Sequence, residues 1–157
     1  MKQADRAAKL LFQKKLTIAS AESCTGGMIA AELVNYSGMS AHFNEGYVTY
    51  SNEAKVKNLG VKEETLAGHG AVSKETAAQM ALGVQKRSGA DIGIATTGIA
   101  GPDGGTPEKP VGLVYIGCAY RNKVVVRRFT FSGNRYQVRL AATKSAFSLV
   151  ADVIERF

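Results

Sequence analysis

Residue types and patterns that mark several common protein classes are scarce or missing in this chain of 157 residues. No apolar run approaches the roughly 18 residues that cross a membrane, and residues 1–15 lack the apolar stretch of a secretory signal. The two cysteines, Cys24 and Cys118, have no CxxC spacing, so we expect free thiols in a reducing compartment. The sequence therefore predicts a cytoplasmic protein with no membrane partner.

Signatures of metal sites and of familiar hydrolases are also missing. The only two histidines, His42 and His69, belong to no recognisable motif, and neither HxxxH nor HExxH occurs. Without a cysteine pair as well, we predict no metal and no cofactor. The GxSxG turn of α/β-hydrolases and the GxxxxGK[ST] loop that binds nucleoside triphosphates do not occur either. Nothing in the sequence supports a Ser-His-Asp triad.

The hydrophobic residues, 45% of the chain, are enough for one buried core. Their spacing predicts helices that alternate with strands, followed by one hairpin around Arg121 and Asn122. We predict helices over residues 4–14, 24–36, 52–59, 74–87 and from 134 to the end, and strands over residues 16–23, 43–50, 90–98, 113–120 and 123–131. This order predicts a single domain, residues 1–157, with an α/β fold: a three-layer α/β/α sandwich on a mixed β-sheet.

The net charge of +7 is concentrated towards the C-terminus. Residues 109–151 contain eight lysines and arginines and no acidic residue. Such a segment attracts anions without identifying them, because a phosphate-bearing metabolite and a nucleic-acid backbone would both respond. A solvated basic face without a ligand is the third interpretation. The segment lacks the aromatic, zinc-binding and helix-turn-helix patterns of nucleic-acid-binding domains, so we consider nucleic acid an unlikely partner.

Two predicted strand ends are polar and rich in glycine, at residues 22–27 and 96–105. Ligands of open α/β sheets collect at the carboxyl ends of strands, so these two segments locate the candidate site. In the first, Ser23 stands between a strand and a helix, where free backbone N–H groups can hold an oxyanion or a phosphate. The alternative is that Ser23 or Thr25 only caps the helix.

A nucleophilic serine needs a base, and lysine is the common choice when histidine is not available. Lys55, just after the strand 43–50, is the best-placed lysine, and the arginines of the last helix could lower its pKa. The alternative is an ordinary solvated lysine. Glycines after Thr97 form a plausible anion cradle. Arg135 and Arg139 share a helix face, where they could grip one phosphate or pair with surface carboxylates.

Four motifs in one order resemble the CinA C-terminal domain family, which includes stand-alone nicotinamide-nucleotide amidases. The motifs are AESCTGG (21–27), VTYSNEAK with LGV (48–55 and 59–61), TTGIAGPDGGTPEKPVG (96–112) and FSGNR with VR (131–135 and 138–139). The resemblance implies a CinA-like three-layer fold, usually a homodimer. It also implies hydrolysis of the carboxamide of nicotinamide mononucleotide to nicotinate mononucleotide and ammonia.

By this resemblance, Ser23 is the expected nucleophile and Lys55 its lysine partner, and an arginine is expected to bind the phosphate, for which we favour Arg135. Backbone amides near residues 24–26 would hold the oxyanion. The residues expected around the substrate are Cys24, Thr25, Gly26, Tyr50, Thr97, Gly98, Gly101, Arg135 and Arg139. The alternative is a non-catalytic nucleotide-binding module of the same family, which has an association with competence and DNA damage.

Overall fold

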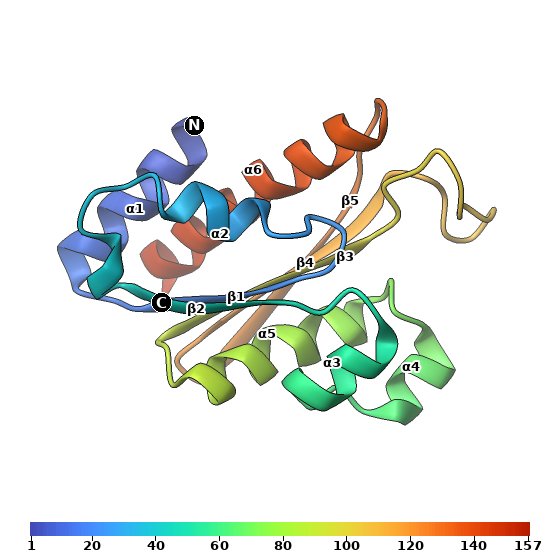
Figure 1. Cartoon of the computed structure of the whole chain (residues 1–157), viewed down its shortest axis with the longest axis horizontal. Helices are drawn as coiled ribbons and strands as arrows, with labels where there is room; N and C mark the ends of the chain where they lie inside the picture. The colour runs from blue at the N-terminus through green and yellow to red at the C-terminus, as the bar shows by residue number, and fades with distance from the viewer.

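The computed structural model describes all 157 residues as a five-stranded sheet with helices on both faces (Figure 1). The elements in chain order are α1 (Lys2–Lys14), β1 (Ile18–Glu22), α2 (Met28–Leu33), the 3-10 turn η1 (Met39–Ala41), β2 (Phe43–Val48), α3 (Asn52–Leu59), α4 (Glu63–His69), α5 (Lys74–Ser88), β3 (Ile92–Gly98), β4 (Leu113–Tyr120), β5 (Lys123–Thr130) and α6 (Arg135–Arg156). The predicted α/β sandwich on a mixed sheet is confirmed.

The strands lie in the order β2-β1-β3-β4-β5. The first three strands of this order run parallel, and β4 and β5 are antiparallel to their neighbours. In Figure 1, α1, α2 and α6 cover one face of the sheet, and α3, α4 and α5 cover the other. Each face has its own buried cluster, the larger around Leu11 and Phe147 and the smaller around Met80 and Val84. No helix is both long and apolar enough to span a bilayer.

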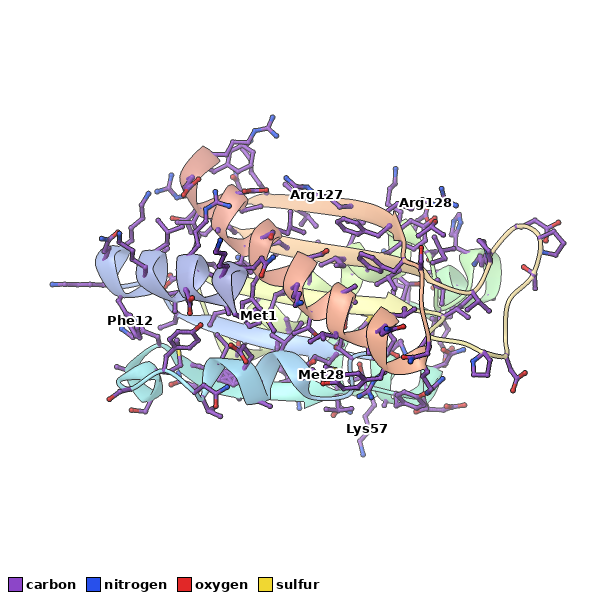
Figure 2. The ribbon with its side chains drawn as sticks, turned by 90° about the horizontal axis from the view of Figure 1, so that it is seen from above. Met1, Phe12, Met28, Lys57, Arg127 and Arg128 are labelled. Atoms are coloured by element: carbon purple, nitrogen blue, oxygen red, sulfur yellow. The ribbon has the colours of Figure 1, made fainter.

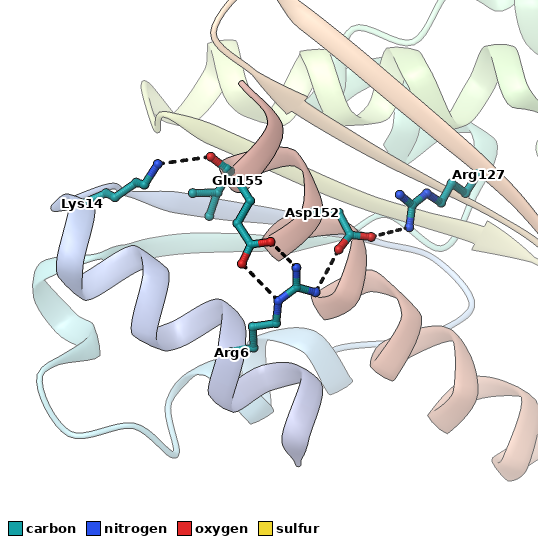
Figure 3. A network of polar contacts seen from close by, with 6 residues as sticks. Arg6, Lys14, Arg127, Asp152 and Glu155 are labelled. Atoms are coloured by element: carbon teal, nitrogen blue, oxygen red, sulfur yellow. Dashed lines mark hydrogen bonds and ion pairs between the residues drawn. The ribbon is translucent and has the colours of Figure 1, made fainter.

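Salt bridges connect α1 with α6, and α6 with the edge strand β5 (Figure 3). Asp152 on α6 accepts hydrogen bonds from Arg6 on α1 and from Arg127 on β5, both at 2.8 Å. Arg6 also binds Glu155. Burial acts against ionisation of Asp152, but the hydrogen bonds from Arg127 and Arg6 prevail and lower the pKa of its carboxyl group.

One element prediction was wrong in its bounds, and one helix was not predicted. The helix predicted over residues 24–36 begins only at Met28, because residues 24–27 form a tight turn in which Gly26 and Gly27 have positive φ angles of 58° and 107°. The short helix α4 was not predicted, since its seven residues show no clear apolar periodicity. The hairpin β4–β5 does turn at Arg121 and Asn122, and Arg121 adopts a φ of 57° there.

Candidate active site

The two glycine-rich strand ends lie side by side, because β1 and β3 are parallel neighbours in the sheet. Glu22 is paired with Thr96 in the register of the two strands, and the N–H of Ser23 donates to the carbonyl of Thr96 at 3.0 Å. The predicted meeting of both segments at the carboxyl edge of the sheet is therefore confirmed.

Lys55 reaches Ser23 from the neighbouring strand connection. Its Nζ lies 3.1 Å from Ser23 Oγ and 2.8 Å from the carbonyl of Thr49, with a longer contact of 3.5 Å to the carbonyl of Tyr50. Lys55 is 1% exposed and Ser23 is 8% exposed. The alternative of an ordinary solvated lysine is therefore wrong.

Local structure explains this position of Lys55. β2 runs parallel to β1, so the chain after it arrives at the same edge of the sheet as Ser23. The Ser51 side chain caps α3 by accepting a hydrogen bond from the N–H of Ala54, and the helix begins at Asn52, three residues before Lys55. Lys55 therefore occupies the first turn of α3 and points to the sheet edge.

The surroundings of Lys55 favour its neutral form. None of the ion pairs of the molecule involves this lysine. Burial lowers the pKa of the Lys55 ammonium below its ordinary value, and the nearby Cys24 opposes the shift weakly. The expectation that the arginines of α6 lower this pKa is wrong, because desolvation alone produces the decrease.

The turn at residues 23–26 is closed by a hydrogen bond from the N–H of Gly26 to the carbonyl of Ser23, at 3.0 Å. This bond uses the amide of Gly26, so it is not free to hold an oxyanion. The N–H groups of Cys24 and Thr25 donate to no backbone acceptor. Only residues 24 and 25 therefore have free N–H groups at this turn, which is fewer than the predicted range of residues 24–26.

Beneath the turn lies a buried carboxylate that the sequence analysis did not single out. Glu22, 1% exposed, accepts hydrogen bonds from the hydroxyl of Thr25 at 2.6 Å and from the N–H groups of Ile29 and Ala30 at 2.9 and 3.1 Å. Thr25 also shares a hydrogen bond of 2.8 Å with Thr96. The Thr25 hydroxyl thus holds the turn together. The only signal in the sequence was the position of Glu22 inside the first motif.

A cavity of about 270 Å³ opens at Ser23 and Lys55. The first two motifs contribute Ser23, Cys24, Tyr50 and Lys55 to its wall, and the last two contribute Thr97, Gly98, Gly101 and Arg135. Three of the residues expected around the substrate do not line it: Thr25, Gly26 and Arg139. The hydroxyl of Thr97 donates to the carbonyl of Ala71 at 2.7 Å and so fixes the loop before α5 against the cavity.

Other lining residues were missed. Ala71 and Val72 come from the loop between α4 and α5, and no pattern in the sequence connects that loop to Ser23. Asp103 comes from the glycine-rich loop and is the only acidic residue of the wall. The position of Asp103 in the third motif was a signal that could have identified it as a residue of the cavity wall.

The two arginines of the last motif have different surroundings. Arg135 spans the mouth of the cavity, where it donates to the carbonyl of Gly101 at 2.8 Å and to the hydroxyl of Tyr50 at 3.0 Å. Arg139 lies one helical turn further along α6 and donates to the carbonyls of Cys24 and Thr25. Neither arginine pairs with a carboxylate, in contrast to the alternative of surface ion pairs.

Neither histidine nor cysteine competes with Ser23 and Lys55 for a catalytic role at this edge. His42 precedes β2, at the opposite edge of the sheet, and its Nδ1 lies 2.7 Å from the carbonyl of Leu16. His69 is half exposed, 3.7 Å from Glu75, and does not line the cavity. Burial, assisted by Glu22, raises the pKa of the Cys24 thiol to about 11, so this thiol is not ionised near neutral pH.

Basic residues lie at both edges of the molecule. Figure 2 places Arg127 and Arg128 on β5 at one edge of the molecule and Lys57 at the opposite edge. Arg127 is engaged by Asp152, while Arg135 and Arg139 are engaged at the turns around the cavity. No group of three or more His, Cys, Asp and Glu side chains could hold a metal ion.

Comparisons with known proteins agree on one family. The family model described as CinA C-terminal domain matches residues 1–154. A relative from Clostridium kluyveri is 54% identical over 142 residues, which are 90% of this chain and 35% of that protein. A relative from Clostridium perfringens is 60% identical over 131 residues, 83% of this chain and 32% of that protein. Both are provisionally described as competence-damage inducible proteins, and the chain spans about a third of their length.

Solved structures give the same result. A CinA superfamily protein from Klebsiella pneumoniae superposes with a TM-score of 0.95 at 35% identity, covering 99% of this chain and 98% of that chain. A competence/damage inducible protein from Agrobacterium tumefaciens superposes with a TM-score of 0.94 at 42% identity, covering 99% and 94%. The shared fold therefore extends over the whole chain.

Proposed function

This chain belongs to the CinA C-terminal domain family, and we propose that it is an amidohydrolase in which Ser23 attacks a carboxamide and Lys55 is the base. The observation that carries the proposal is the buried 3.1 Å contact between Lys55 Nζ and Ser23 Oγ, on the wall of a cavity. A structural lysine would gain nothing from burial without a carboxylate partner. A base for serine needs this environment, because only the neutral amine can accept a proton.

The contacts of Lys55 define how the neutral amine would be oriented. A neutral amine has two N–H donors and one lone pair. The carbonyl oxygens of Thr49 and Tyr50 can only accept hydrogen bonds, so they take the two N–H groups. The lone pair is then left for the hydroxyl proton of Ser23. The two carbonyls therefore act as an orienting group for the base, the role that a third residue has in a catalytic triad.

The proposed reaction proceeds in two halves. In the first, Ser23 Oγ forms a bond to the carboxamide carbon while its proton moves to Lys55 Nζ, and the C=O electron pair becomes an oxyanion. As this intermediate collapses, the C–N bond breaks and Lys55 returns the proton to the leaving nitrogen, which departs as ammonia. In the second half, Lys55 deprotonates a water that attacks the ester, and the Ser23 Oγ–C bond breaks as Lys55 returns this proton to Ser23 Oγ. The sum is an amide and water giving an acid and ammonia.

We propose nicotinamide mononucleotide as the substrate. Its carboxamide would lie at Ser23, and its phosphate would lie at the mouth of the cavity. Arg135 lies there with backbone from the glycine-rich loop beside it, and a guanidinium can bind phosphate oxygens in pairs. A volume of about 270 Å³ in an open cavity suits a ligand that is partly held at the surface.

The test is ammonia release from nicotinamide mononucleotide by the wild-type chain, with the other product identified by mass. The proposal predicts stoichiometric ammonia and nicotinate mononucleotide. A chain that binds the nucleotide but releases no ammonia would contradict it and would favour the non-catalytic nucleotide-binding module.

A further inference from the structure

Arg139 makes two hydrogen bonds to the nucleophile turn, although it does not line the cavity. Its Nε donates to the carbonyl of Cys24 at 2.9 Å, and its Nη2 donates to the carbonyl of Thr25 at 3.1 Å. A Cβ atom at Gly26 would lie 3.2 Å from the same Nη2, so the guanidinium is packed directly against the turn. Arg139 therefore holds two consecutive peptide groups of the turn, Cys24–Thr25 and Thr25–Gly26.

Because each peptide group is planar, a contact that holds its carbonyl also fixes the direction of its N–H group. In a trans peptide the N–H points away from the carbonyl of the preceding residue, within one rigid plane. The carbonyl of Thr25, held by Arg139, therefore fixes the direction of the Gly26 N–H. In the same way the carbonyl of Ser23, held by the Gly26 N–H, fixes the Cys24 N–H. The Cys24 N–H has no backbone acceptor and belongs to a residue of the cavity wall, whereas Thr25 is fully buried and does not line the cavity.

Glu22 secures the turn from below. Its carboxylate joins the Thr25 hydroxyl to the first turn of α2 through the N–H groups of Ile29 and Ala30. The side chain of Thr25 is thus held by Glu22, and its carbonyl is held by Arg139. A residue fixed at both its side chain and its carbonyl cannot rotate its peptide groups freely, so the direction of the Gly26 N–H, and with it that of the Cys24 N–H, is set before a substrate binds.

We propose that Arg139 is a positioning residue that sets the Cys24 N–H as an oxyanion donor on the cavity wall, with Glu22 as its counterpart beneath the turn. This inference rests on the proposed amidase function. Arg139 acts through the peptide groups and does not touch the substrate. Its positive charge also polarises the carbonyl of Thr25, which strengthens the Gly26 N–H of the same peptide group as a donor to the carbonyl of Ser23. Arg135, in contrast, faces the cavity and contacts the ligand.

The proposal predicts a division of kinetic effects between the two arginines. Oxyanion donors act mainly in the transition state, so Arg139→Met should lower kcat by about 10- to 100-fold while KM changes less than about threefold. The matched variant Arg135→Met, one helical turn away, should raise KM by about tenfold or more. An Arg139→Met enzyme with raised KM and normal kcat would overturn the inference and make Arg139 a substrate ligand.

A rescue experiment separates positioning from general destabilisation. Arg139→Ala leaves space for a free guanidinium ion, and we expect guanidinium chloride below its denaturing concentration to restore part of the lost kcat. The same salt should not rescue Ser23→Ala. If melting temperature falls while kcat is unchanged, or if guanidinium restores nothing to a folded variant, the inference is wrong.

Labelling of Ser23 by a fluorophosphonate distinguishes this inference from the proposed function, because the phosphoryl oxygen occupies the oxyanion hole without any amide chemistry. The Arg139→Met chain should be labelled at least about tenfold more slowly than wild type. A wild-type chain that is labelled but releases no ammonia would contradict the amidase proposal alone. Equal labelling of both chains would contradict the role of Arg139 alone, and a wild-type chain that is neither labelled nor active would contradict both.

Discussion

At the scale of single residues, Lys55 combines two properties that conflict in an ordinary lysine: it is almost fully buried, and it has no ionic partner. Burial of a charged amine costs free energy, and this cost is the physical source of the lowered Lys55 pKa. Lys55 would destabilise the folded state if it were charged, and the proposed reaction needs it in its neutral form.

The first prediction concerns the pH dependence of turnover. Lys55 must be neutral to accept the Ser23 proton, so kcat/KM should rise with pH through the pKa of Lys55 in the free enzyme. Because burial lowers that pKa below its ordinary value of 10.5, the rise should level off below pH 10.5. The measurement is kcat/KM for nicotinamide mononucleotide between about pH 6 and pH 10. A profile that falls as the pH rises through this range would contradict the assignment of Lys55 as the base.

The sequence identified the residues whose chemical type and position are both distinctive. Ser23 ends one predicted strand and Lys55 follows another, and the parallel-sheet rule brings such ends together. The division of labour between Arg135 and Arg139 could not be predicted, since it depends on carbonyl groups more than thirty residues away in the chain. Glu22 was overlooked because its three partners are backbone and hydroxyl groups, which leave no pattern of residue types.

At the scale of elements, the position of α3 decides whether Lys55 can reach Ser23. α3 is packed against α5 so closely that a Cβ atom at Gly83 would lie 1.9 Å from the carbonyl oxygen of Leu59. Backbone atoms cannot yield as a flexible side chain can. Gly83 therefore sets the distance between the two helices, although it lies far from Ser23 in the sequence.

Accordingly, Gly83→Ala should move α3 and reduce both stability and turnover. We expect the free energy of unfolding to fall by about 1–3 kcal/mol, the usual cost of overpacking. Thermal unfolding and ammonia release would measure the two effects. Gly68→Ala in α4 is the matched control, because a Cβ there would meet nothing within 4 Å, and it should be neutral or slightly stabilising. Equal behaviour of the two variants would show that the α3–α5 contact is not restrictive.

The element boundaries show where sequence reasoning fails. Residues 24–27 carry a helix-like pattern that merges with α2, but two glycines with positive φ form the turn that exposes Ser23. Helix α4 is too short for its periodicity to be read, and it carries the chain to Ala71 and Val72 at the cavity. Both errors concern segments at the candidate site, where the backbone departs from the regular hydrophobic periodicity of helices and strands.

At the scale of the whole molecule, the predicted α/β alternation was sufficient to anticipate a three-layer sandwich. The strand order was not deducible from periodicity, because hydrophobic patterning does not specify which strands become neighbours. Long-range polar contacts complete the assembly, and the network centred on Asp152 joins the helical layer to the edge strand β5.

For this network we predict a stability effect that depends on pH. Asp152→Asn should lower the free energy of unfolding at pH 7 by about 1 kcal/mol or less, since the side chain is 36% exposed and partly screened by solvent. The folded-state pKa of Asp152 is lowered, so its contribution is complete above 3.8 and is lost as the pH falls through the folded pKa. Thermal unfolding across this range should show the two proteins converging in acid.

The control is Glu108→Gln, which changes an exposed acid of the glycine-rich loop that takes part in no ion pair. It should not alter the melting temperature at either pH. A difference between Asp152→Asn and wild type that persists unchanged in acid would show that the network does not act through the charge of Asp152.

The most direct test of the central claim is the rate of ammonia release from nicotinamide mononucleotide by Ser23→Ala and Lys55→Ala, each verified as folded by circular dichroism. The account predicts that both variants lose at least about 1,000-fold in kcat, because residues that act as one unit are lost together. A folded Ser23→Ala protein that retained turnover close to that of wild type would contradict the assignment of Ser23 as nucleophile.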